Sequence, residues 1–162
     1  MKTTLLLIPG IFNDASLWDE VAPALAPLAD VRRLDLLTQD SIPAMAEAAW
    51  EQLADLPPAA PVALVGFSMG GYVALEMLAR PARPLRAAAL VSTSARTESP
   101  EAAATREKTI AALPRHFERV VDGILQFGTH EATPQLLQEL KPMMLRVGAD
   151  IAVRQNRATM AR

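Results

Sequence analysis

The residues best suited to chemistry lie in Gly66-Phe67-Ser68-Met69-Gly70. The apolar run 62–65 precedes this turn and predicts a buried strand, and a longer apolar run after it predicts a buried helix. A serine at the apex of a strand, sharp turn and helix sits in strained backbone with its hydroxyl exposed, which makes it a candidate nucleophile. Gly66 and Gly70 would leave room for the strand and helix to pack closely. The alternative is a tight turn with an idle serine.

Two segments resemble the α/β-hydrolase family of esterases, lactonases and related enzymes. One is Leu5-Leu-Leu-Ile-Pro-Gly-Ile-Phe-Asn-Asp-Ala-Ser-Leu-Trp18, and the other is the turn at Ser68 with its helix. The resemblance implies that Ser68 attacks a carbonyl carbon while two backbone N–H groups bind the oxyanion. Met69, which follows the nucleophile, would supply one N–H group. Ile11, which follows Gly10 after the first strand, would supply the other.

Apolar side chains next to these groups predict a pocket. Phe12 and Phe67 are the candidates for its lining, together with Met69. Ordinary core positions are the alternative for all three, and a plain strand end is the alternative for Pro9-Gly10.

The sequence offers no clear base or acid to activate the serine. In the family that the chain resembles, the acid and then the histidine follow the nucleophile along the chain. The two histidines here, His116 and His130, fall in a helical part where we expect exposed positions. Asp14, Asp35 and Glu98 are substitute carboxylates, although a turn residue, a strand-end residue and a solvated charge are the expected roles.

The fold expected from the apolar runs is α/β. Strands are predicted at 3–8, 31–37, 62–65 and 85–91, and helices from Ser16, at 43–56 and after Ser68. The apolar stripe expected for the first helix comprises Leu17, Trp18, Val21, Leu25 and Leu28. Continuous apolar runs favour a parallel sheet covered on both faces, whose ligands bind beyond the carboxyl ends of the strands.

From Ser92 onward the pattern becomes helical. Helices are predicted at 101–113, 115–127, 134–147 and 149–162, with a break at Pro114. The resemblance implies that this part is a lid over the site. We therefore expect a partial α/β-hydrolase core at 1–93 and a helical lid segment at 94–162.

Composition narrows the classes of partner. The 162 residues carry a formal net charge of −2, no cysteine and no basic run, so neither disulfides nor nucleic-acid binding is expected. No apolar run reaches membrane-spanning length, and a cytoplasmic protein is expected. The histidines lack metal-site spacing, so neither a metal nor another cofactor is expected.

The function expected by resemblance is hydrolysis of a small carboxylic ester, lactone or related acyl substrate through a Ser68 acyl-enzyme. A non-catalytic binding protein or truncated product and an acyltransferase are the alternatives. The apolar strand 85–91 is expected at a sheet edge, where it would pair with a complementing chain or a second copy. The chain is accordingly expected to be one part of something longer.

Overall fold

The computed structural model describes residues 2–162 as four strands, one short 3-10 helix and six α-helices. The strands are β1 (Thr3–Ile8), β2 (Ala29–Arg33), β3 (Val62–Phe67) and β4 (Ala87–Val91). The first half of the chain also contains η1 (Ala15–Trp18), α1 (Val21–Leu25), α2 (Ile42–Glu51) and α3 (Met69–Ala79). The second half contains α4 (Pro100–Gly128), α5 (Pro134–Val147) and α6 (Ala149–Met160).

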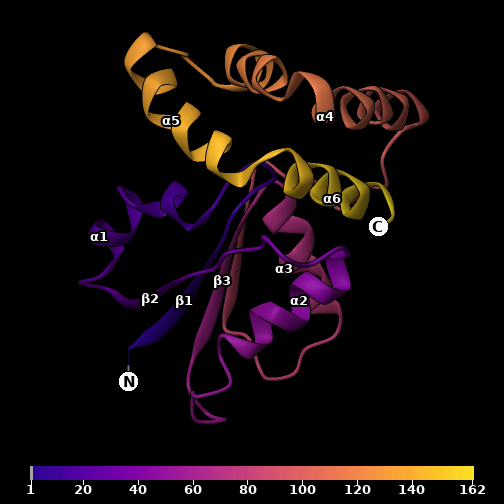
Figure 1. The fold of residues 1–162 in the computed structure, drawn as a ribbon. Coiled ribbons are helices and arrows are strands. Elements are labelled where there is room, and N and C mark those ends of the chain that lie inside the picture. The colour runs from indigo at the N-terminus through magenta and orange to yellow at the C-terminus, as the bar shows by residue number, and fades with distance from the viewer. Residues whose placement is uncertain (1) are drawn as a thin grey trace.

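The four strands form one parallel sheet in the order β2-β1-β3-β4. Figure 1 shows η1 and α1 on one side of this sheet and α2 and α3 on the other. The central strands are buried because helices flank them, which accounts for their continuous apolar sequences. The predicted α/β class and the parallel sheet are thus confirmed.

The second strand is shorter than predicted and begins earlier. The prediction was residues 31–37, whereas β2 ends at Arg33, which pairs with Leu7 of β1. One further bond follows, from the Leu34 N–H to the Leu7 carbonyl at 3.0 Å. Beyond it, Pro9 has no N–H group and β1 has ended, so the chain leaves the sheet. Leu34 and Leu36 still look strand-like in sequence because they are buried in the core.

The first helical region also differs from the prediction. Asp14, rather than Ser16, caps it, since the Asp14 carboxylate accepts a hydrogen bond from the Ser16 amide at 2.9 Å. The region divides into η1 and the five-residue α1, which contains Pro23. The expected apolar stripe is wrong at its far end, where Val21 and Leu28 are 45% and 76% exposed.

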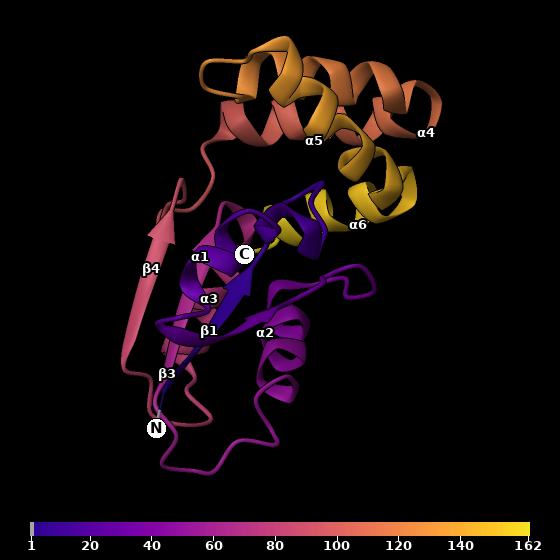
Figure 2. The same cartoon turned by 90° about the vertical axis from the view of Figure 1, so that its left-hand side faces the viewer.

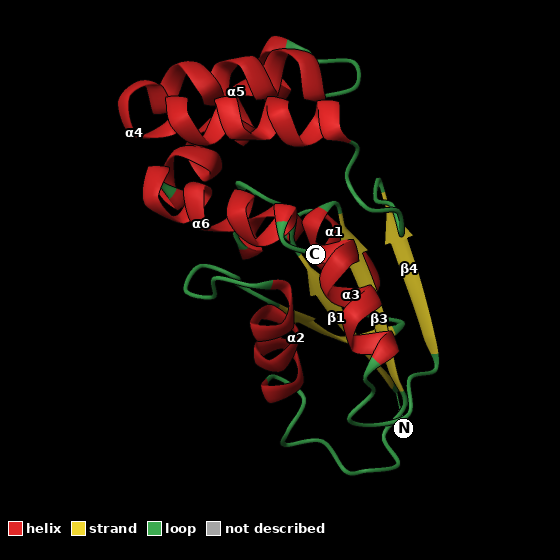
Figure 3. Cartoon of the chain, turned by 90° about the vertical axis from the view of Figure 1, so that its right-hand side faces the viewer, coloured by secondary structure: helices red, strands yellow, loops and turns green. Residues whose placement is uncertain are grey.

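A helical layer lies beyond the carboxyl ends of the strands (Figures 1 and 3). The predicted break near Pro114 occurs as a kink in the merged helix α4, with non-helical backbone at His116 (φ −135°, ψ 33°). Helices α4, α5 and α6 share an apolar cluster with the loop after β1, through Phe12. Helix α6 also contributes Ala158 to the cluster between the sheet and helices α2 and α3. This helical layer therefore packs directly on the sheet domain.

Strand β4 is an outer strand of the described sheet (Figure 2). All five of its residues are exposed, including Leu90 and Val91 at 43% each. Among residues 2–162, no helix is both long enough and apolar enough to cross a membrane.

Candidate active site

Ser68 occupies the turn between β3 and α3. Its backbone has φ 52° and ψ −114°, a conformation that is strained for any residue with a side chain. Ser68 is also the N-cap residue of α3, where a serine hydroxyl usually accepts a hydrogen bond from the first turn. Here the Ser68 hydroxyl makes no such capping bond, and it has no other hydrogen-bond partner among residues 2–162. The local fold therefore leaves the Ser68 hydroxyl available.

The neighbouring strand holds this turn in place. The Ser68 N–H donates to the Val91 carbonyl at 2.9 Å, which ties the turn to the end of β4. The Ser68 carbonyl accepts from the Gly71 N–H at 2.9 Å and from the Thr93 hydroxyl at 2.8 Å. These three bonds fix the peptide groups on both sides of Ser68, so the strained conformation is maintained by its surroundings.

The flanking glycines are required by close packing. A Cβ atom on Gly66 would lie 2.4 Å from the Gly70 carbonyl oxygen, and one on Gly70 would lie 2.2 Å from the Ile8 carbonyl oxygen. Both neighbours are backbone atoms, which have little freedom to move away. The spacing of the motif thus reflects direct contact between strand β1, strand β3 and the start of α3.

The loop after β1 brings the second predicted group to the same region. A Cβ on Gly10 would lie 2.9 Å from both Asn13 Oδ1 and Phe67 Cδ1, so Gly10 lets this loop lie against the end of β3. Within the described residues, no acceptor bonds to the Ile11 N–H. Met69 is the first residue of α3, where N–H groups lack intrahelical partners. Both amides are therefore candidates to bind an oxyanion.

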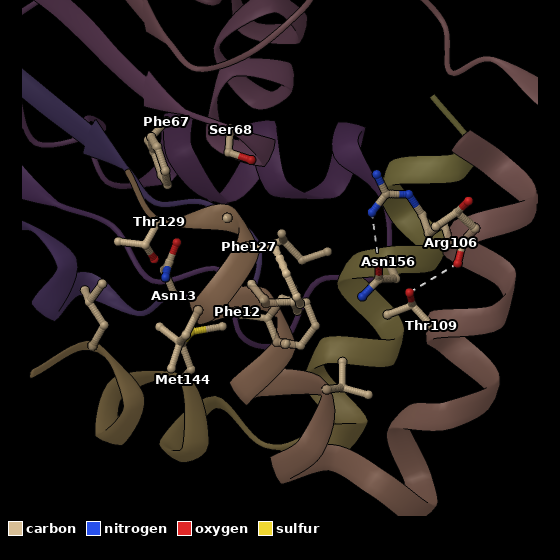
Figure 4. A pocket seen from close by; sticks show the side chains of 18 of the residues that line it. Phe12, Asn13, Phe67, Ser68, Arg106, Thr109, Phe127, Thr129, Met144 and Asn156 are labelled. Atoms are coloured by element: carbon tan, nitrogen blue, oxygen red, sulfur yellow. Dashed lines mark hydrogen bonds between the residues drawn. The ribbon is translucent and has the colours of Figure 1, made fainter. Parts of the chain in front are cut away.

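A cavity of about 980 Å³ lies between the sheet domain and the helical layer, and Ser68 contributes to its wall. Figure 4 shows Ser68 and Phe67 on one wall, with Phe12 and Phe127 nearby. Further apolar side chains also line it: Ile11, Leu17, Val120, Ile124, Leu125, Leu140, Met143 and Met144. Phe12 and Phe67 line this cavity, whereas the Met69 side chain is buried in the core.

One end of the cavity is polar (Figure 4). Arg106 of α4 donates to Glu98 through Nε and Nη2 at 2.7–3.1 Å, and its Nη1 donates to Asn156 Oδ1 of α6 at 2.9 Å. The hydrogen bonds and charge of Arg106 hold the pKa of the Glu98 carboxyl below its usual value, against the opposing effect of burial. Glu98 is 11% exposed, so the expectation of a solvated charge is wrong.

The structure places neither histidine at the cavity. Both His116 and His130 are exposed, and neither lines the wall that includes Ser68. Asp14 caps η1 and pairs with Arg146, and Asp35 accepts a hydrogen bond from the Ala15 amide at 2.6 Å. Glu98 alone of the three substitute carboxylates lines the cavity, and its partner is Arg106.

Several residues of the site have no signal in a local motif. Thr93, Arg106 and Asn156 act through partners 25 and 50 positions away along the chain. Gln155 bonds to the loop after β1 from 143 positions away. Gln155 and Asn156 are adjacent buried amides in α6, and their burial is seen only in the structure. Among residues 2–162, no group of three or more His, Asp or Glu side chains could hold a metal ion.

Comparison with known proteins shows which family the chain belongs to. A model of the alpha/beta hydrolase family matches residues 5–161. A search of curated proteins gave no match. Among solved structures, a hydrolase from Pseudomonas aeruginosa PA01 superposes with a TM-score of 0.84 at 21% identity, covering 98% of this chain and 64% of that one.

Two further structures show the same fold. A thermophilic esterase from Thermogutta terrifontis has a TM-score of 0.82 at 20% identity, covering 100% of this chain and 64% of its own. The enol-lactonase from Burkholderia xenovorans LB400 has a TM-score of 0.83 at 20% identity, covering 99% and 66%. The chain thus spans less than two thirds of the length of these proteins. Because the family match extends over nearly all 162 residues, the chain belongs to the alpha/beta hydrolase family.

Proposed function

We propose that this chain carries the nucleophile and the oxyanion-binding groups of a serine hydrolase. The observation that carries the proposal is Ser68 itself, which combines a strained backbone at φ 52°, a hydroxyl free of the usual capping bond, and a place on the wall of a large cavity. Strain concentrated at a residue with an available nucleophilic atom is typical of an active site.

In the proposed reaction the Ser68 oxygen attacks a substrate carbonyl carbon and forms a tetrahedral intermediate. The amides of Ile11 and Met69 donate to the oxygen that becomes negative, and the N-terminus of α3 adds a favourable partial charge. Collapse expels the alcohol and leaves an acyl group on Ser68, which water then releases as the acid. The attacking hydroxyl must give its proton to a base during the first step.

The substrate class is a small carboxylic ester, a lactone or a related acyl compound. A cavity of about 980 Å³ with a mostly apolar wall suits an acyl group and its leaving alcohol. The esterase and lactonase among the structural neighbours favour the same class. We further propose that residues 94–162 act as a lid, since α4 and α5 supply most of the apolar wall away from the sheet.

We propose that the base and its orienting acid come from a polypeptide segment outside these 162 residues. The exposed edge of β4 is where that segment would attach. A strand added parallel to β4 would end beside Val91, whose carbonyl already bonds to the Ser68 amide. The loop after such a strand would reach the cavity, because the carboxyl ends of parallel strands meet at one edge of the sheet.

A non-catalytic binding protein is the second candidate. It is favoured by one observation: the cavity is well formed, yet neither His116 nor His130 lines it. The two candidates make opposite predictions for Ser68→Ala, which removes the nucleophile but leaves the cavity walls unchanged.

The test measures hydrolysis of short-chain esters and lactones by the unsubstituted protein and by Ser68→Ala. Both are produced in the natural host and purified with any polypeptide that accompanies them. We expect Ser68→Ala to abolish turnover, with a loss of about a thousandfold or more, because nothing else can form the acyl-enzyme. An unchanged rate in this variant would contradict the serine mechanism. Binding of substrate without turnover in either protein would favour the binding function.

A further inference from the structure

The Gln155 side chain joins helix α6 to two loops at the carboxyl edge of the sheet. It is fully buried, and both ends of its amide are used. Its Oε1 accepts a hydrogen bond from the Phe12 N–H at 2.9 Å, and its Nε2 donates to the Leu36 carbonyl at 3.0 Å. Phe12 follows β1 and Leu36 follows β2. A carboxamide fits this place because it holds an acceptor oxygen and a donor NH₂ group in a fixed geometry.

The Phe12 backbone is held in an unfavourable conformation. Its φ of 62° is rare for a residue with a bulky side chain, so its surroundings must hold it there. Phe12 is 3% exposed and packs in the apolar cluster of the helical layer. Its N–H is bonded to Gln155 rather than to the loop itself. Side-chain packing and the Gln155 bond therefore fix this residue from two directions.

The neighbouring residue, Ile11, is the proposed oxyanion donor. The loop is restrained on the other side of Ile11 as well, since the Gly10 carbonyl accepts from the Asn13 N–H at 3.3 Å. The direction of the Ile11 N–H depends on the peptide groups that these contacts hold. Releasing the Phe12 amide would let Phe12 leave its positive φ and would turn the adjoining peptide group.

We propose that Gln155 is a positioning residue for this loop: it holds the Phe12 amide and thereby aims the Ile11 amide at the oxyanion site. The catalytic part of the proposal rests on the proposed function, whereas the structural part does not. Gln155 acts without touching the substrate, since it does not line the cavity. Loss of Gln155 would therefore weaken stabilisation of the transition state, in which the oxyanion forms, more than it would weaken substrate binding.

The structural part is tested on the 162-residue chain by amide hydrogen exchange measured with NMR. Gln155→Met keeps a side chain of similar length but removes the acceptor. We expect the Phe12 amide to exchange about tenfold faster or more, because a buried donor loses its only partner. Arg157→Gln, at an exposed position of the same helix, is the matched control. Unchanged exchange at Phe12 in a folded Gln155→Met variant would overturn the proposal.

A second variant distinguishes loss of the Gln155 hydrogen bonds from general unfolding of the chain. Gln155→Glu can accept from the Phe12 amide in either protonation state, but it can donate to the Leu36 carbonyl only when protonated. When ionised, this carboxylate would face the Leu36 carbonyl without a proton to donate, and the repulsion between the two oxygens would displace it from the Phe12 amide. We therefore expect Phe12 protection to recover toward lower pH in this variant and to change little with pH in Arg157→Gln after correction for intrinsic exchange. A pH response equal to that of the control would contradict the assigned contacts.

The catalytic part is tested by measuring kcat and KM of the active enzyme and of its Gln155→Met variant, both produced in the natural host. Gln155→Met should lower kcat about 10- to 100-fold with little change in KM, because a misaligned oxyanion donor weakens transition-state binding. If Gln155→Met lowered Phe12 protection and folding stability by equal amounts but left kcat unchanged, Gln155 would have a structural role alone. That result would overturn the positioning claim. If the unsubstituted protein lacks Ser68-dependent turnover, the proposed function fails and the exchange results alone decide the role of Gln155.

Discussion

At Ser68 the backbone conformation that lowers stability is combined with the side chain of the proposed nucleophile. Its backbone conformation suits glycine, yet the residue carries a side chain, whose hydroxyl the proposed reaction requires. We expect Ser68→Gly to unfold at a higher urea concentration than Ser68→Ala, with a difference of about 1 kcal/mol in the free energy of unfolding. Both variants lack the hydroxyl, so the comparison isolates the backbone strain. Equal stabilities would mean that the turn is not strained.

Gly66 and Gly123 form a contrasting pair of glycines. A Cβ on Gly66 would lie 2.4 Å from the Gly70 carbonyl oxygen, whereas a Cβ on Gly123 of α4 would meet nothing within 4 Å. We expect Gly66→Ala to lose about 3 kcal/mol or more of stability through overpacking. Gly123→Ala should gain about 0.5–1 kcal/mol, because alanine favours a helix interior. Urea denaturation of the two variants measures both, and a tolerated Gly66→Ala would contradict the described packing.

At the residue scale, the sequence predicted what a local pattern can encode. Ser68, Gly66 and Gly70 stand in a motif that predicts a nucleophile when it lies between a strand and a helix. Arg106 and Gln155 could not be found this way, because their partners come close only after the helical layer packs on the sheet. Their roles depend on three-dimensional packing that one sequence does not reveal.

At the scale of elements, the ion pair between Arg106 and Glu98 links the start of α4 to the loop before it, and Asn156 extends the link to α6. Because Arg106 lowers the pKa of Glu98 in the folded chain, the unfolded chain takes up a proton at this carboxyl at higher pH. The contribution of the pair to stability is therefore complete above the ordinary glutamate pKa. It is lost as the pH falls through the lowered pKa of the folded state.

We expect Glu98→Gln to be less stable than the unsubstituted protein at neutral pH by about 1–3 kcal/mol, since a bidentate charged pair is lost. The gap should narrow as the pH falls into the acidic range. Thermal or urea unfolding at a series of pH values measures it, with the exposed Glu107→Gln as the control. A gap of constant size at all pH values would contradict the pairing.

The edge strand β4 is the element most exposed to other chains. Its residues are all exposed, and the sheet continues no further among residues 2–162. We expect the isolated chain to associate with rising concentration and Leu90→Lys to reduce that association, because a charge on an edge strand opposes pairing. Sedimentation velocity measures the effect. Association that is identical in Leu90→Lys would place the contact elsewhere.

Element boundaries show where sequence reasoning loses accuracy. Helix α5 was predicted well because a capping residue, Thr133, precedes it and Gly148 follows it, and the end of strand β1 was predicted well because Pro9-Gly10 follows it. Strand β2 was misplaced because Leu34 and Leu36 are buried without being in the sheet. Burial and strand pairing produce the same apolar pattern, and only the partner strand separates them.

At the scale of the whole molecule, the chain places a helical layer over the carboxyl edge of a parallel sheet, with a cavity between them. The alternation of elements predicted the sheet, and the loss of strands after Ser92 predicted the helical part. The contacts of α6 with the sheet domain could not be predicted. They depend on Ala158, which joins the core cluster of the sheet domain, and on Gln155, whose partners Phe12 and Leu36 lie in the first third of the chain.

The central claim is that Ser68 is a nucleophile whose general base comes from a segment outside these 162 residues. The most direct measurement is the intact mass of the protein after exposure to a fluorophosphonate, alongside Ser68→Ala. The chain alone should label slowly. Added imidazole, which can serve as a base, or the polypeptide segment proposed to carry the base should produce one adduct that Ser68→Ala lacks. A folded chain that stays unlabelled under both conditions, or an adduct that persists in Ser68→Ala, would contradict the claim.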